Sequence, residues 1–171
     1  MITLVQAMVE IALQRRGPED LPASTFLFQL VLLVYILIGT LSAAIYWRSA
    51  AQVVLQVGLE LVLLFGFFSA VLGFYRKAER RLQTFIALLG TGSLLSALAI
   101  PLQLWRQATG ADQSTALLPV LGLLALLMWS LAVTGHILHH AIEVPYLGGV
   151  LLAMGYFALS VALSAMLFPA A

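Results

Sequence analysis

The chain has 171 residues, of which 63% are hydrophobic and 9% are charged, with a formal net charge of +1 at neutral pH. Soluble domains carry roughly 25% charged residues, so this composition and the mean hydropathy of +1.07 indicate an integral membrane protein. The near-neutral charge gives no basic surface for nucleic acid, and the absence of cysteine excludes disulfides, thiol catalysis and thiolate metal sites.

The first predicted element is a short amphipathic helix within residues 1–16. Four polar residues recur at helical spacing and form one narrow stripe among apolar neighbours: Thr3, Gln6, Glu10 and Gln14. About fourteen residues are too few to cross a hydrocarbon core of ~30 Å. We therefore expect this helix to lie in the membrane interface, and the alternative is a helix packed against the rest of the protein.

A polar loop, residues 17–24, precedes the membrane domain, residues 25–171. Ser24 at the end of the loop is a favourable N-cap for the first long helix. Five hydrophobic runs follow, and each is close to the ~20 residues that a membrane-spanning helix needs. The predicted spans are residues 25–47, 53–75, 84–105, 116–138 and 146–168. The predicted fold class is thus all-α, a bundle of five transmembrane helices preceded by the short interfacial helix.

The basic residues are divided unevenly between the two ends of these spans. With a cytoplasmic N-terminus, the inner side holds Arg15, Arg16, Arg76, Lys77, Arg80 and Arg81, and the outer side holds Arg48 and Arg106. The positive-inside rule therefore predicts a protein of the bacterial inner membrane with its N-terminus inside and its C-terminus outside. Trp47 and Trp105 then both mark the outer interface.

Small residues recur at spacings of four within the spans. The pairs are Gly39 and Ala43, Gly92 and Ser96, Gly149 and Ala153, and Ser160 and Ser164. In lipid such pairs allow two helix backbones to approach closely, since no hydrophobic effect drives one apolar helix against another. The pattern indicates a closely packed bundle.

Glu60 is the only acidic residue well inside a predicted span, and Gln56 lies one turn earlier on the same face. A charge near the middle of a membrane costs roughly 2.5–3.5 kcal/mol on insertion scales, so an intramembrane carboxylate is a functional candidate. One interpretation is a proton or cation relay. The alternative is a protonated or paired carboxyl that only fixes the packing, held by Arg48, Arg106 or Gln103 of neighbouring spans.

All three histidines lie in the stretch GHILHHAIE, residues 135–143. On a helix His136, His140 and Glu143 share a narrow arc, which is compatible with a divalent metal site. Membrane di-iron enzymes need several such histidine boxes, and a bis-histidine haem needs ligands on opposite sides of the iron. With no further histidine in the chain, we expect no metal or other cofactor, and instead an interfacial polar cluster at the inner end of a span.

The segment RKAERR, residues 76–81, joins the second and third spans. It contributes four candidates for binding lipid headgroups, Arg76, Lys77, Arg80 and Arg81. A basic residue close to an anionic membrane surface contributes about 1 kcal/mol to such binding. The simpler interpretation is that these charges determine the topology and bind no ligand.

The stretch EDLPAS, residues 19–24, places Asp-Leu and then Pro directly before the first span. With a short cytoplasmic N-terminal region and five spans, this arrangement resembles the Yip1-type family of small membrane proteins, whose corresponding motif is Asp-Leu-Tyr-Gly-Pro. The tyrosine and the glycine are missing here, and no catalytic residue is carried over. The resemblance implies membrane trafficking or organisation through partner proteins.

The chain carries no nucleotide-binding loop and no hydrolase or kinase signature. We therefore expect a non-enzymatic membrane protein that binds or organises other membrane proteins, as a subunit or an assembly factor. Its expected partners are membrane lipids and either another membrane protein or a second copy of itself. A small transporter or channel that uses Glu60 is the first alternative, and a metal- or haem-binding redox subunit is the second.

Overall fold

The computed structural model describes residues 2–46, 49–109 and 113–168, and every regular element in these ranges is a helix. The helices are α1 (Ile2–Ala12), α2 (Thr25–Tyr46), α3 (Ala50–Phe74), α4 (Arg81–Ala108), α5 (Gln113–Ile142) and α6 (Tyr146–Leu167), with 3-10 turns η1 (Pro18–Asp20) and η2 (Ala78–Arg80). The five from α2 to α6 are long and apolar enough to cross a membrane. The predicted all-α fold of five transmembrane helices after a short helix is confirmed.

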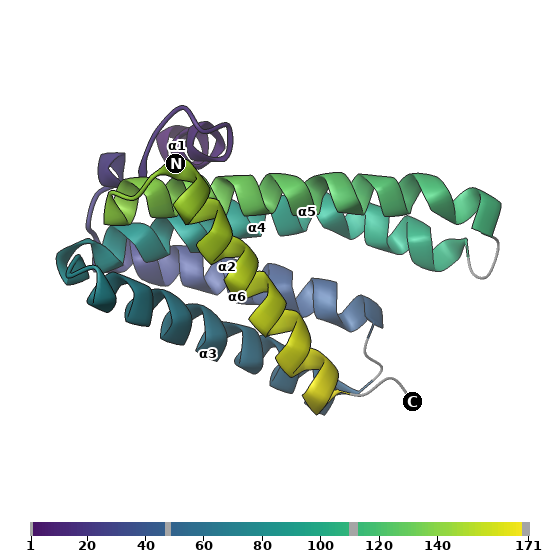
Figure 1. The fold of residues 1–171 in the computed structure, drawn as a ribbon. Helices are drawn as coiled ribbons and strands as arrows, with labels where there is room; N and C mark the ends of the chain where they lie inside the picture. Colours follow the sequence, from purple (N-terminus) through teal and green to yellow (C-terminus); the bar gives the residue numbers. More distant parts are fainter. Residues whose placement is uncertain (1, 47–48, 110–112, 169–171) are drawn as a thin grey trace.

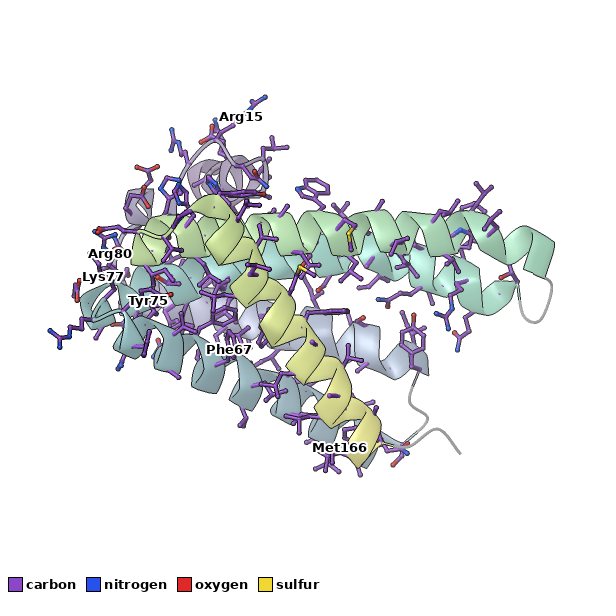
Figure 2. All side chains as sticks on the ribbon, in the orientation of Figure 1. Arg15, Phe67, Tyr75, Lys77, Arg80 and Met166 are labelled. Carbon is purple, nitrogen blue, oxygen red and sulfur yellow. The ribbon has the colours of Figure 1, made fainter. Side chains whose placement is uncertain are left out.

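The five long helices run between two ends of the molecule (Figure 1). One end holds η1, η2 and the turn from α5 to α6, and we call it the basic end because Lys77 and Arg80 lie there (Figure 2). The helices α4 and α5 form a long hairpin, and α6 crosses the bundle diagonally (Figure 1). The C-terminal end of α6 lies at the opposite end.

The packing is centred on α4. Half of the membrane-length part of α4 is buried, against at most 22% of any of the other four. It packs mainly against α2 and α5, and α5 packs against α6. Ile86, Ala87 and Leu89 of α4 are fully buried, as are Phe68 of α3 and Ile137 of α5. These residues lie toward the basic end, so the tightest part of the core is there.

The contact between α5 and α6 depends on two glycines. A Cβ atom at Gly149 would overlap the carbonyl oxygen of Gly135, and a Cβ at Gly135 would lie 2.8 Å from the Cα of Val150. Ala153, one turn after Gly149, is also buried. The two helix backbones therefore touch, as small residues allow in a membrane protein. Gly39 of the predicted pair on α2 faces open space instead.

The short helix α1 packs against the bundle through one face. Met8 and Ile11 are buried, and a Cβ at Gly90 of α4 would overlap the sulfur of Met8. The indole Nε1 of Trp129 in α5 donates to the carbonyl oxygen of Ala12 at 2.8 Å. Val5 and Leu13 stay exposed on another face. The packed alternative thus describes the contacts of α1, and its exposed apolar face remains available to lipid.

One helix boundary agrees with the predicted spans, and another differs in an informative way. The hydroxyl oxygen of Ser24 accepts a hydrogen bond from the backbone N–H of Leu27 at 3.4 Å, so α2 begins at the predicted cap. In contrast, α5 continues past residue 138 through the histidines and ends before Glu143, whose φ is 58°. Hydropathy marks the part of a helix that fits the lipid, whereas the helix itself continues until the backbone hydrogen bonding is broken.

Candidate functional site

A polar cavity of about 240 Å³ lies between α2, α3 and α4, from the middle of the bundle toward the end opposite the basic end. Its lining consists of Tyr35, Gly39, Ser42, Ala43 and Tyr46 from α2, Gln56 and Glu60 from α3, and Ser93 and Ser96 from α4. Seven of these nine residues carry a polar side chain, in helices that are otherwise strongly apolar. The two residues that the sequence singled out on α3 therefore share a site with hydroxyl groups of two other helices.

Gln56 holds the carboxyl group of Glu60. Its Nε2 donates to Oε1 of Glu60 at 3.1 Å, one helical turn away, and also to Oγ of Ser164 in α6 at 3.4 Å. Both amide N–H groups are thereby used. The Oε1 atom of Gln56 is buried and has no hydrogen-bond partner among the described residues. The amide thus connects α3 to α6 and leaves a buried acceptor beside the carboxylate.

Two serines of the lining direct their hydroxyl hydrogens away from the cavity. Ser42 Oγ donates to Oε1 of Gln103 at 2.9 Å, which connects α2 to α4. Ser93 Oγ donates to the carbonyl oxygen of Leu89 at 2.7 Å within α4. Because a hydroxyl oxygen also has lone pairs, both serines can still accept a hydrogen bond from a group in the cavity.

The side chains that the sequence suggested as partners for Glu60 do not pair with it in the described part of the structure. The guanidinium of Arg106 lies over the ring of Tyr46, 5.7 Å from its centroid, and its side chain is exposed. The side-chain oxygen of Gln103 accepts the hydrogen bond from Ser42. Arg48 lies outside the described residues. Within the described ranges no basic side chain forms an ion pair with Glu60, whose polar neighbours are the amide of Gln56 and the hydroxyls of the lining.

The cavity is bordered differently at its two ends. At Tyr46 it adjoins a larger cavity of about 870 Å³, which lies between the ends of α2, α3 and α4 that are farthest from the basic end. Toward the basic end, Phe65 packs edge to face between Phe28 and Phe85, with ring centroids 6.0 and 4.9 Å apart. The aromatic rings close the bundle on that side, so the polar site faces one end of the molecule.

The histidines of GHILHHAIE each have a partner of their own. His136 Nε2 donates to the carbonyl oxygen of Arg16 at 3.0 Å, His139 Nδ1 contacts the carbonyl oxygen of Val144, and His140 Nδ1 pairs with the carboxylate of Glu19 at 2.7 Å. In the described part of the chain, no three histidine or acidic side chains converge as a metal site would require. His136 and His140 fasten the N-terminal segment to α5, and His139 binds the turn that follows α5, an arrangement that does not favour the metal- or haem-binding alternative.

Glu143 joins two of the turns at the basic end. Its carboxylate lies 2.8 Å from Lys77 Nζ and 2.7 Å from an Nη atom of Arg80, and Arg80 also donates to the carbonyl oxygen of His140 at 2.9 Å. The ammonium of Lys77, followed by the guanidinium of Arg80, holds the pKa of Glu143 below its ordinary value. The four candidates for headgroup binding therefore fall into two pairs. Lys77 and Arg80 form ion pairs with Glu143, whereas Arg76 and Arg81 have exposed side chains.

The segment EDLPAS docks on α4. Leu21 is almost fully buried, and the side-chain amide of Gln83 donates to the carbonyl oxygen of Leu21 at 2.8 Å. Comparison with protein-family models, curated proteins and solved structures gave no match. The resemblance to the Yip1-type family therefore stays a prediction.

Sequence reasoning missed most of the residues that complete the polar cavity. Tyr35, Ser42, Tyr46 and Ser93 are ordinary residues in long apolar runs, and nothing in the one-dimensional pattern assigns them to one site. The register between helices was needed to bring them together.

Proposed function

We propose that the protein is a small membrane transporter of the carrier class, with its solute site in the polar cavity around Glu60. The observation that carries the proposal is that Glu60 lines a cavity shared by three membrane-length helices, with hydroxyl and amide groups around it. A carboxyl group that only fixed packing would be enclosed by neighbouring side chains. Intramembrane ionisable residues that face a cavity are typical of solute and proton pathways.

The aromatic packing favours a carrier over an open channel. The rings of Phe28, Phe65 and Phe85 fill the bundle between the cavity and the basic end. A channel needs a continuous path, whereas a carrier exposes its site to one side at a time. In this proposal, release toward the basic end requires Phe65 and its neighbours to separate.

The charge distribution supports an orientation for the site. Four basic residues lie around η2 at the basic end, Arg76, Lys77, Arg80 and Arg81, and Arg106 is the described basic residue toward the other end. By the positive-inside rule the basic end is cytoplasmic. The polar cavity then opens toward the outer side of a bacterial inner membrane, and the protein takes its solute from that side.

Flux measurements with purified protein in liposomes test the transport proposal. Glu60→Gln keeps the shape and the hydrogen bond of the side chain but removes its ability to ionise, so we expect proton or cation flux to fall to that of empty liposomes. Glu79→Gln removes one charge at an exposed position of η2 and is the matched control, with unchanged flux. Equal flux for Glu60→Gln and wild type would contradict the proposal.

A second candidate function is the association with a membrane-protein partner or a second copy that the sequence suggested. It is favoured by one face of α3, where Gly58, Val62, Gly66 and Ala70 recur every fourth position and are exposed. A Cβ atom added at Gly58 or at Gly66 would meet no neighbouring atom within 4 Å, so no described part of the chain covers this face of α3 at the two glycines. Small residues at this spacing let a second helix approach closely.

Disulfide trapping in membranes tests this association, because the native chain has no cysteine. If two copies meet through α3, Gly66→Cys gives a covalent dimer on mild oxidation, while Ala158→Cys on the exposed face of α6 does not. A protein that purifies alone as a monomer, with no dimer from Gly66→Cys, would remove the support for this candidate.

A further inference from the structure

Resting on the transport function proposed above, we infer that the solute is a small organic ammonium ion, bound with its N–H groups directed to the oxygens of Glu60 and Gln56. The inference comes from the hydrogen-bonding capacity that the cavity leaves unused. It names the chemical class of the solute, which the transport proposal alone does not.

The cavity has more free acceptors than free donors. Both N–H groups of Gln56 are engaged, by Glu60 and Ser164, while its Oε1 remains buried without a partner in the described residues. When Glu60 is ionised, its carboxylate accepts hydrogen bonds and donates none. One of its two oxygens receives no hydrogen bond from Gln56. A buried acceptor without a donor costs free energy, so a ligand that supplies donors is preferred.

The serines of the lining strengthen the same preference. The hydroxyl hydrogens of Ser42 and Ser93 are donated to Gln103 and to the carbonyl oxygen of Leu89, which leaves only lone pairs for the cavity. The hydroxyls of Tyr35 and Ser96 can accept as well as donate. A ligand with several N–H donors can satisfy these oxygens, whereas an anion would meet oxygen lone pairs on several sides.

Charge and aromatic rings favour a cation over a neutral donor. None of the nine residues of the lining is basic, so a bound ammonium is attracted by the carboxylate of Glu60 without a competing charge inside the cavity. Tyr35 and Tyr46 present aromatic rings, which attract an ammonium through cation–π interaction. The exposed side chain of Arg106 already makes a cation–π contact with the ring of Tyr46.

The size of the cavity favours an organic ammonium over a bare metal ion. A volume of about 240 Å³ is just below the ~300–1,000 Å³ of drug-sized ligand pockets, so it fits an ion of a few heavy atoms. The lining contributes a single carboxylate, whereas divalent ion sites are usually built from more.

Calorimetric titration of the detergent-purified full-length protein tests the inference with four probes: ethylammonium, tetramethylammonium, sodium and acetate. Ethylammonium should bind saturably to wild type and to the control Glu79→Gln. Tetramethylammonium has the same charge but no N–H group, so its affinity should be about 10- to 100-fold lower. Glu60→Gln should weaken ethylammonium binding by a similar factor, and acetate should not compete.

A second variant addresses the case in which Glu60→Gln does not fold. Ser96→Leu fills the cavity from α4 and leaves Glu60 in place, so it should weaken ethylammonium binding at least as much as Glu60→Gln does. Equal binding of ethylammonium and tetramethylammonium, tighter binding of sodium, or ethylammonium binding that survives both variants would overturn the inference.

The two proposals fail in different ways. If liposome flux depends on Glu60 but ethylammonium does not bind, the transport function stands and the ammonium inference is wrong. If ethylammonium binds through Glu60 but wild-type protein gives no flux, the ligand class stands and the carrier function is wrong.

Discussion

At the scale of single residues, the packing is tight at the contact between Gly135 and Gly149 and open around Glu60. The carbonyl oxygen of Gly135 occupies the space where a side chain at Gly149 would begin. Around Glu60, in contrast, polar groups border open volume. The sequence could point to Glu60 and Gln56, because a carboxylate and an amide are conspicuous in an apolar run. It could not show that Ser164 accepts a hydrogen bond from Gln56, or that Ser42 donates to Gln103, since those contacts join residues far apart in the chain.

Substitution of Gly149 tests the close contact between α5 and α6. Gly149→Ala places a Cβ against the carbonyl oxygen of Gly135, so the helices must separate, and overpacking of this kind costs about 1–3 kcal/mol. Gly155→Ala in the same helix meets no atom within 4 Å and should keep or slightly raise the thermal stability. Thermal unfolding in detergent measures both variants. A Gly149→Ala protein as stable as Gly155→Ala would contradict the described contact.

At the scale of helices, periodicity and length predicted which segments are helical but not which faces meet. The short helix predicted within residues 1–16 is α1, but it ends at Ala12, so Gln14 of the predicted polar stripe lies in the turn after the helix, with a φ of 58°. The burial of Ile11 and the contact of Met8 with Gly90 could not be predicted, because they depend on a glycine in α4. The length of α5 was underestimated because the histidines reduce hydropathy without ending the helix. Their partners, Arg16 and Glu19, lie in the N-terminal segment and are not evident from local sequence.

The attachment of α1 gives a prediction at this scale. Trp129→Phe keeps an aromatic side chain but removes the hydrogen bond from Nε1 to the carbonyl oxygen of Ala12, a loss of about 0.5–1.5 kcal/mol. We expect faster hydrogen exchange in residues 2–12, while the exchange of α4 stays unchanged. Trp105→Phe, at an exposed position of α4, is the matched control and should leave α1 unaffected. Equal protection of α1 in both variants would show that the indole does not hold it.

At the scale of the whole molecule, the bundle is tightly packed toward the basic end and leaves polar volume toward the other. The large buried side chains of α3, α4 and α5 gather near the basic end, among them Phe68, Ile86 and Ile137. Composition and hydropathy predicted five spans, because those properties add up along each segment. The uneven packing could not be predicted, since it results from where α6 crosses α5 and from how far α4 and α5 extend together (Figure 1).

The most direct test of a solvent-accessible polar site around Glu60 is thiol labelling of a single cysteine at Ser96, which lines the cavity in a chain that has no cysteine of its own. We predict that a small, membrane-impermeant thiol reagent added to the outer side of intact cells labels Ser96→Cys. Ala158→Cys, on the exposed apolar face of α6, should stay unlabelled. Absence of labelling at Ser96→Cys from the outer side, or labelling only from the cytoplasmic side, would contradict an outward-facing site around Glu60.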